Sequence, residues 1–100
     1  MNPRKKKIGK RVRRFLEEQV PLFNEKALYP TGLEEAIVGI VERCSQEPLI
    51  VLDREKIIRI LMKRDRMKRG EAEEFCETNI IGAWMGDGTP MFLTRMENVL

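Results

Sequence analysis

The stretch 79–93 constrains the fold most, because it holds the only tryptophan, Trp84, and three of the seven glycines. Its centre reads Gly-Asp-Gly. Asp-Gly between two apolar runs is a strong hairpin signal, because the turn needs residues that tolerate φ > 0. We therefore predict strands over 80–84 and 91–94, joined by a loop over 85–90. Trp84 is expected to be buried in the core, and this stretch contains no catalytic signature.

The chain has no histidine. This excludes histidine as a general base, catalytic triads that contain histidine, and almost every kind of zinc site. The two cysteines, Cys44 and Cys76, form no C-x-x-C motif and are expected to be free thiols in a reducing compartment. Carboxylates such as Glu73 and Glu74 are adjacent in sequence, so on a helix they do not face each other. We therefore expect a protein that is not an enzyme and that binds no cofactor or metal ion.

The hydropathy pattern gives no sign of a membrane protein. No apolar run approaches the roughly 20 residues of a membrane span. The basic start resembles that of a signal peptide, but no apolar segment follows it. We expect a cytoplasmic protein without a membrane span.

The charges are unevenly distributed along the chain. Residues 1–14 carry eight of the 19 basic residues and no acid, which leaves 11 basic against 16 acidic residues in 15–100. The chain is therefore a +8 arm attached to a −5 body. Such asymmetry suggests either an arm that binds a polyanion or an arm that docks on the protein's own acidic surface.

Residues 1–7 are expected to be a disordered tip, and an amphipathic helix is predicted from Ile8 to about Gln19. Pro21 should end it, because proline disfavours the helical conformation of the preceding residue. The apolar stripe of this helix contains Ile8, Val12, Phe15, Leu16 and Val20. Its basic face contains Lys7, Lys10, Arg11 and Arg14.

The segment 33–44 fits two structures. Its apolar residues have helical spacing, which on pattern alone favours a helix, but 37–41 is rich in β-branched residues and contains a glycine. The run 49–52 has the composition of a short buried strand, with 45–48 as a hairpin loop. Asp53 is a suitable N-cap for a helix over 54–65, and a second helix is predicted over about 71–79.

Several motifs in the body resemble a family of small uncharacterised proteins of bacteriophages and bacteria. They are EAIVG at 35–39, ERC at 42–44, VLD at 51–53, EKII at 55–58, EAEEF at 71–75 and N-x-x-G-A-W-x-G-x-x-T-P at 79–90. The resemblance covers about 33–93, and the closing motif is its most specific part. It implies a strand over 36–43 that pairs with 49–52, followed by two helices. It implies no substrate, because the family has no settled activity.

The link between the two predicted helices departs from that family. Arg66 stands where a glycine would adopt the left-handed conformation at a helix C-terminus, which should cost about 1 kcal/mol. Lys68 replaces an N-cap hydroxyl. Both changes add positive charge, and the basic N-terminal helix is itself an addition to the shared body.

Together these features predict a small α+β fold, in which a small antiparallel sheet packs against two to three helices and a basic N-terminal helix or arm is added. The expected divisions are 1–20 for the arm and amphipathic helix, 21–32 for a connection, 33–94 for the compact domain and 95–100 for a tail. The exposed edges of such a small sheet favour a homodimer.

We expect a non-enzymatic binding protein whose basic helix engages nucleic acid or another polyanion. The candidate nucleic-acid-binding residues are Arg4, Lys5, Lys6, Lys7, Lys10, Arg11 and Arg14. A second basic patch contains Lys63, Arg64, Arg66, Lys68 and Arg69. The alternative for both clusters is a solvated surface, with local salt bridges at the second.

Two further functions stay open. One is a protein-interaction module, such as a phage inhibitor or accessory factor that acts on a host protein. It would use the acidic body or the apolar stripe at 8–20. The other is a pocket for a small nucleotide or signal molecule. The candidate pocket residues are Arg43, Asn79, Trp84 and Thr89. The alternative is that Trp84 only anchors the core and that the glycines serve the turn.

Overall fold

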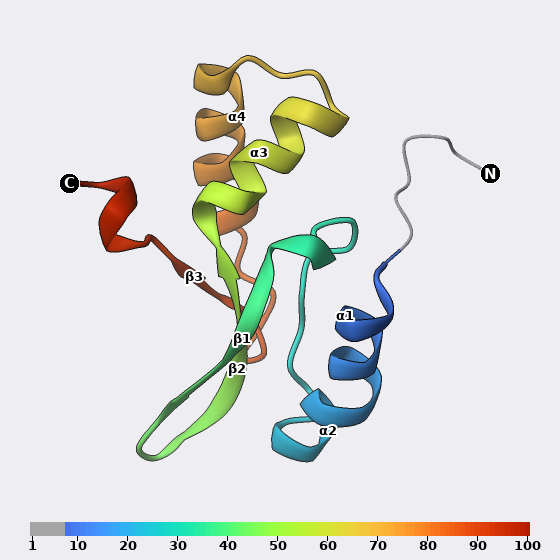
Figure 1. The fold of residues 1–100 in the computed structure, drawn as a ribbon. Coiled ribbons are helices and arrows are strands. Elements are labelled where there is room, and N and C mark those ends of the chain that lie inside the picture. The colour runs from blue at the N-terminus through green and yellow to red at the C-terminus, as the bar shows by residue number, and fades with distance from the viewer. Residues whose placement is uncertain (1–7) are drawn as a thin grey trace.

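The computed structural model describes residues 8–100 and confirms an α+β fold (Figure 1). The expectation for 1–7 lies outside these residues. The longer elements are α1 Lys10–Arg14, α2 Val20–Phe23, β1 Ile37–Arg43, β2 Gln46–Asp53, α3 Arg54–Arg64, α4 Arg69–Phe75 and β3 Met91–Leu93. The π-helical segments Phe15–Gln19 and Cys76–Ile81 and the 3-10 turns Glu34–Ala36 and Met96–Asn98 complete the chain. Within 8–100, no helix has the length and apolar character needed to cross a membrane.

The sheet has the order β1-β2-β3. β1 and β2 form the antiparallel hairpin that the resemblance implies, and the helix favoured by the pattern of 33–44 is absent. The β-branched residues of 37–41 are half-buried against the sheet and its neighbours, which suits strand geometry. β3 pairs with β2 in parallel, so the sheet is mixed.

The predicted hairpin across 79–93 is wrong in its first half. The apolar pair Ile80 and Ile81 belongs to the π-helical continuation of α4 and not to a strand. The helix ends at Gly82, whose N–H donates to the Glu77 carbonyl at 3.0 Å. A Cβ on Gly82 would lie 2.8 Å from the Thr78 carbonyl oxygen, so glycine is required by this close approach. Only the second strand of the prediction exists, as β3.

The N-terminal helix does not end before Pro21. It continues through α2 to Phe23, with Val20 in the helical region at φ −54° and ψ −45°. The π-helical segment Phe15–Gln19 ends one residue before Val20–Pro21. Proline has no N–H to donate and its ring crowds the preceding turn, and the wider turn of a π-helix accommodates both effects. Proline is also tolerated in the first turn of a helical segment.

One face of the sheet carries the main core. Paired residues point to the same side of a sheet, so one face contains Ile37, Ile40, Ile50, Leu52 and Phe92. These side chains pack together with the buried residues of α3 and α4, namely Ile57, Ile58, Leu61 and Ala72. The opposite face contains Val41, Leu49, Val51, Met91 and Leu93. Among the described residues, these five are not part of that core cluster.

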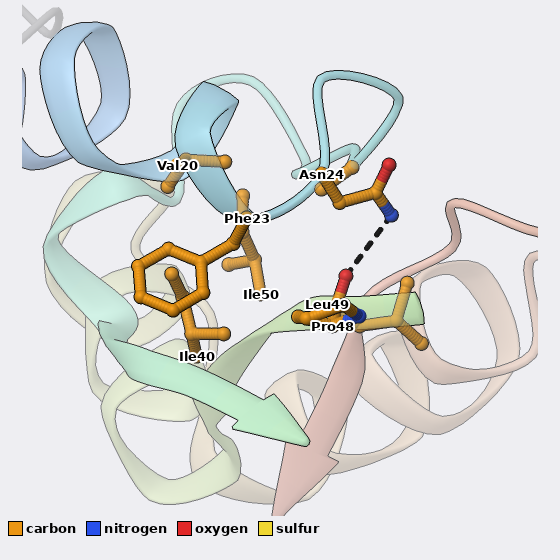
Figure 2. A pocket seen from close by; sticks show the side chains of 8 residues that line it. Val20, Phe23, Asn24, Ile40, Pro48, Leu49 and Ile50 are labelled. Atoms are coloured by element: carbon orange, nitrogen blue, oxygen red, sulfur yellow. Dashed lines mark hydrogen bonds between the residues drawn. The ribbon is translucent and has the colours of Figure 1, made fainter. Parts of the chain in front are cut away.

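The end of the N-terminal helix packs on the same covered face (Figure 2). Val20 and Phe23 lie against Ile40 and Ile50, with no room between them for a water molecule. The side chain of Asn24 is buried and its Nδ2 donates to the Pro48 carbonyl at 3.0 Å. The helix is thus attached to the sheet by apolar packing and by a satisfied buried amide.

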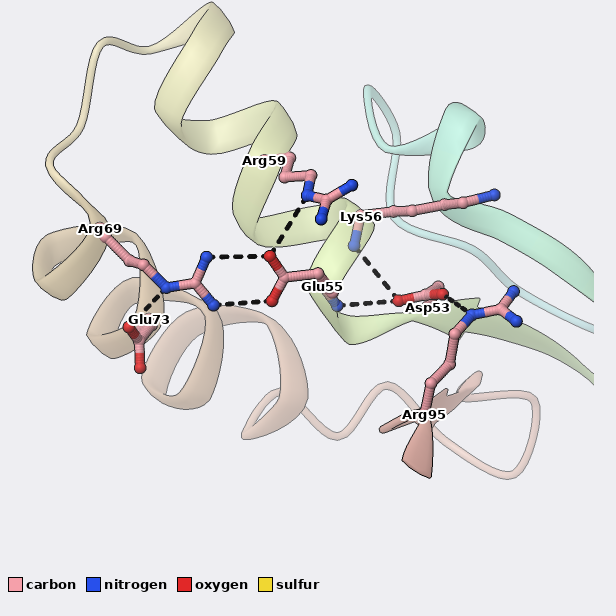
Figure 3. A network of polar contacts seen from close by, with 7 residues as sticks. All are labelled: Asp53, Glu55, Lys56, Arg59, Arg69, Glu73 and Arg95. Atoms are coloured by element: carbon pink, nitrogen blue, oxygen red, sulfur yellow. Dashed lines mark hydrogen bonds and ion pairs between the residues drawn. The ribbon is translucent and has the colours of Figure 1, made fainter. Parts of the chain in front are cut away.

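Asp53 caps α3 as predicted (Figure 3). Its carboxylate accepts hydrogen bonds from the backbone N–H of Glu55 at 2.9 Å and of Lys56 at 3.3 Å. It also accepts from Arg95, which follows β3 in the chain. Burial of Asp53 opposes ionisation, but the hydrogen bonds from Arg95, Lys56 and Glu55 outweigh it, so the pKa of this carboxyl is lowered.

We expect Asp53→Asn to destabilise the fold by about 1–2 kcal/mol at pH 7, because it removes the negative charge at the N-terminus of α3 and the charged partner of Arg95. A carboxyl with a lowered folded-state pKa stabilises above its unfolded pKa of about 3.9. That contribution is lost as the pH falls through the folded-state value. The gap between the two proteins in urea titrations should therefore shrink below about pH 4. The control is Asp87→Asn at an exposed position, which should have the same free energy of unfolding as the parent at each pH. A stability difference between Asp53→Asn and the parent that stays constant down to pH 2 would contradict this account.

The link after α3 confirms the left-handed position at Arg66, where φ is 56°. The next residue, Met67, donates its N–H back to the Leu61 carbonyl at 3.4 Å and packs against the core. Lys68 provides no capping hydroxyl, and its backbone N–H instead donates to Glu71 Oε1 at 3.2 Å. The side chain of Arg66 is exposed. The expected loss of stability at this position therefore comes from its left-handed backbone conformation and not from side-chain packing.

We predict that Arg66→Gly raises the free energy of unfolding by about 1 kcal/mol, or the melting temperature by roughly 4–8 °C. Arg66→Ala removes the same charge but keeps a Cβ, so it should give little of this gain. Thermal and urea unfolding of the three proteins measure the difference. Equal stabilisation by alanine would assign the effect to charge.

Candidate nucleic-acid interface

The basic residues of α1 lie on the exposed side of the N-terminal helix. Lys10, Arg11, Arg13 and Arg14 are all exposed. They are three or four positions apart in the pairs 10/13, 10/14 and 11/14, which places neighbouring pairs on one continuous helical surface. We call these four residues the α1 basic face. Arg13 was not among the residues predicted for binding, although its spacing from Lys10 could have included it.

The opposite side of this helix is fixed to the body. Phe15 and Leu16 are half-buried and pack against the core cluster, and Val20 belongs to it. At the start of the helix, the Gly9 N–H donates to Glu35 Oε1 at 3.3 Å. The predicted apolar stripe is thus used for packing in its second half, which holds the α1 basic face in a fixed orientation.

Within residues 8–100, the α1 basic face has one internal ion pair. Arg14 Nε lies 3.1 Å from Glu18 Oε2, and both side chains are largely exposed. Lys10, Arg11 and Arg13 form no ion pair with any described residue. Arg4, Lys5, Lys6 and Lys7, which were also predicted to bind, lie outside the described residues.

Two residues of the second basic patch, Arg64 and Arg69, form ion pairs within the chain. Arg64 pairs with Asp65 at 2.9 Å and donates to the Gly32 carbonyl at 2.8 Å. The hydrogen bond and the charge of Asp65 raise the pKa of Arg64. Arg69 donates two hydrogen bonds to the carboxylate of Glu55, at 2.7 and 2.9 Å, and a third to Glu73 at 3.1 Å (Figure 3). The hydrogen bonds from Arg69 are the main reason that the pKa of Glu55 is lowered.

Three members of that patch remain exposed without an ion pair among the residues the structure describes, namely Lys63, Arg66 and Lys68. Lys63 belongs to the last turn of α3, and Arg66 and Lys68 follow in the link to α4. This link lies at the top of Figure 1, away from α1. The α1 basic face and these three residues therefore do not form one surface.

The two described cavities do not bring the four predicted pocket residues together. Arg43 lies at the end of the β1–β2 hairpin. Asn79 lines a shallow depression on α4 together with Met67, Glu71, Glu74, Phe75 and Thr78. Neither this depression nor the filled contact beneath α2 is lined by Arg43, Trp84 or Thr89. The Thr89 hydroxyl accepts from the Met85 N–H at 2.8 Å and donates to the Gly86 carbonyl at 2.7 Å, so it serves the turn.

The prediction that Trp84 is buried is wrong, because 72 % of it is exposed. The predicted strand would have placed its side chain on a sheet face, but the π-helical segment Cys76–Ile81 ends at Gly82 and the chain then runs irregularly to β3. The adjacent Met85 is 70 % exposed. Two large apolar side chains that are adjacent in sequence are thus both largely exposed.

The described residues were also compared with the requirements of a metal site and of a disulfide. No group of three or more Cys, Asp or Glu side chains within 8–100 is arranged to hold a metal ion. Cys76 is buried, which raises the pKa of its thiol, while Cys44 is exposed, and both are free. Comparison of the chain with protein-family models, curated proteins and solved structures gives no match.

Because Trp84 is exposed, we expect Trp84→Ala to change the free energy of unfolding by less than about 0.5 kcal/mol. The matched core truncation, Ile58→Ala, should cost about 2–5 kcal/mol, since Ile58 is fully buried. Urea unfolding followed by circular dichroism measures both, without relying on tryptophan fluorescence. A loss at Trp84 comparable to that at Ile58 would contradict its exposed placement.

Proposed function

We propose that this is a non-enzymatic, cytoplasmic binding protein whose α1 basic face engages the phosphate backbone of nucleic acid. The observation that carries the proposal is the group Lys10, Arg11 and Arg13, exposed on a helix that the core fixes in place and without internal ion pairs among the described residues. A solvated arm needs no such fixed orientation. Cations presented at regular intervals on a rigid helix can neutralise successive phosphates.

Residues 4–7 add four more cations directly before this helix in the sequence. Phosphate contacts depend on charge and not on base identity, so we expect binding that is largely independent of sequence and strongly dependent on salt. Each neutralised phosphate on duplex DNA contributes a slope of about −0.9 to log K against log salt. Four contacts would lower the affinity by roughly two decades for a fourfold rise in salt.

The test replaces Lys10, Arg11 and Arg13 with glutamine and leaves Arg14 in its pair with Glu18. The apolar side of the helix is untouched, so the fold should be retained. We expect fluorescence anisotropy with a labelled DNA duplex to show weaker binding and a salt slope shallower by about 2.7, the share of three phosphates.

The matched control carries glutamine at Lys63, Arg66 and Lys68, which removes the same charge from the other basic cluster. It should bind DNA nearly as the parent does. An equal loss of DNA affinity in both triple variants would show that only the net charge matters. If the parent does not bind DNA at low salt, nucleic-acid binding by this face is refuted.

A second candidate function is that of a protein-interaction module, and the exposure of Trp84 and Met85 favours it. Large apolar side chains gathered on a surface often mark protein contacts, and tryptophan is enriched among the residues that dominate them. A host protein that co-purifies after nuclease treatment, and is lost with Trp84→Ala, would support this function. Co-purification that nuclease abolishes would instead support the nucleic-acid proposal.

A further inference from the structure

The C-terminal unit 88–95 is placed by contacts with residues far from it in sequence. The Leu28 N–H donates to the Gly88 carbonyl at 2.9 Å. β3 pairs with β2 at three positions, and Phe92 packs against the core cluster. Arg95 then binds the buried carboxylate of Asp53 (Figure 3). These contacts define a site for the unit on the rest of the molecule.

The connection 83–87, which leads to this unit, is held to the rest of the molecule far less. It contains no helix or strand. The Met85 N–H donates to the Thr89 hydroxyl at 2.8 Å, and the Thr89 N–H and hydroxyl donate to the Gly86 carbonyl at 3.1 and 2.7 Å. Within 8–100, no hydrogen bond joins 83–87 to a residue outside 80–89. The path of the connection is therefore set by its own turn.

The same connection carries the two exposed apolar side chains of Trp84 and Met85. Contact of large apolar surface with water is unfavourable, and burial removes it. The unit 88–95 is thus well satisfied in its site, whereas the connection before it leaves apolar surface in water.

We propose that two copies of this chain exchange the unit 88–95, so that β3 of each copy pairs with β2 of the other. The structure specifies the partner, because the edge of β2 and the carboxylate of Asp53 already accept this segment. The exchange reproduces each contact of the unit with a different chain, which is why such swaps cost little.

The connection 83–87 becomes the hinge of the exchanged dimer. It straightens and gives up only the turn contacts with Thr89. By two-fold symmetry the two hinges pass each other at the dimer axis. Trp84 and Met85 of both copies then bury against one another, which favours the dimer over two closed monomers.

The test mixes two full-length variants that each lack the contact between positions 53 and 95. Asp53→Asn removes the carboxylate and Arg95→Gln removes the guanidinium, so neither protein forms the ion pair alone or with its own copies. In an exchanged dimer of the two variants, Asp53 of one chain meets Arg95 of the other, and one ion pair is restored.

The two variants, one of them isotopically labelled, are refolded together from urea and weighed by native mass spectrometry. We expect the mixed dimer to exceed its statistical share by about fivefold, because only this dimer contains the ion pair. Asp87→Asn mixed with Lys63→Gln is the control. It removes the same charges at exposed positions and should give the statistical ratio.

A dimer in which β3 stays in its own chain would give the statistical ratio for Asp53→Asn with Arg95→Gln as well, and that result overturns the proposal. A parent that stays monomeric to about 1 mM after refolding at that concentration overturns it too.

The hinge is tested by Trp84→Ser in the otherwise unchanged chain. We expect the dimer to weaken by about tenfold or more, because the side chain is exposed in the monomer and buried at the dimer axis. Leu22→Ser is the matched control, since Leu22 is a similarly exposed apolar residue on α2. Sedimentation velocity measures both dimer constants. A dimer constant that Trp84→Ser leaves unchanged, or that both variants weaken equally, contradicts the burial of the hinge.

Discussion

The carboxylate of Asp53 connects three parts of the structure that are distant in sequence. It ends the central strand β2, caps the first turn of α3 and binds Arg95 after β3. Only 2 % of Asp53 is exposed, and a buried charge without partners would be costly. Here two backbone N–H groups and a guanidinium satisfy it, so the direction of α3 and the position of the C-terminal strand depend on one side chain.

The structural features that depend only on residues close in sequence could be predicted from local sequence signals. The cap at Asp53 and the left-handed position of Arg66 follow from residue type and place, because capping and positive φ are decided within a few residues. The periodicity of the N-terminal segment likewise identified a helix with an apolar side and a basic side. The continuation of the helix past Pro21 was not predicted. The rule that a helix ends before proline assumes a regular α-helix, whereas here a π-helical segment precedes the proline.

Features set by distant partners could not be predicted in the same way. Ile80 and Ile81 suit a strand as well as a helix end, and only the close packing around Gly82 decides between them. The two hydrogen bonds from Arg69 to Glu55 join residues 14 positions apart. The sequence therefore showed Arg69 only as a member of a basic cluster, whereas in the fold it pairs with an acidic residue of the same chain. The parallel pairing of β3 with β2 likewise has no local signal.

The short parallel strand also determines which part of the fold opens most easily. β3 is held to β2 by three residue pairs that span about 40 positions of chain, and the contact of Arg95 with Asp53 follows directly after it. Closing so long a loop costs entropy that so few pairs repay only in part. We therefore expect the C-terminal segment to detach more easily than the β1–β2 hairpin, without global unfolding. When it does, the central strand loses its second neighbour while the β1–β2 hairpin and its helices stay folded.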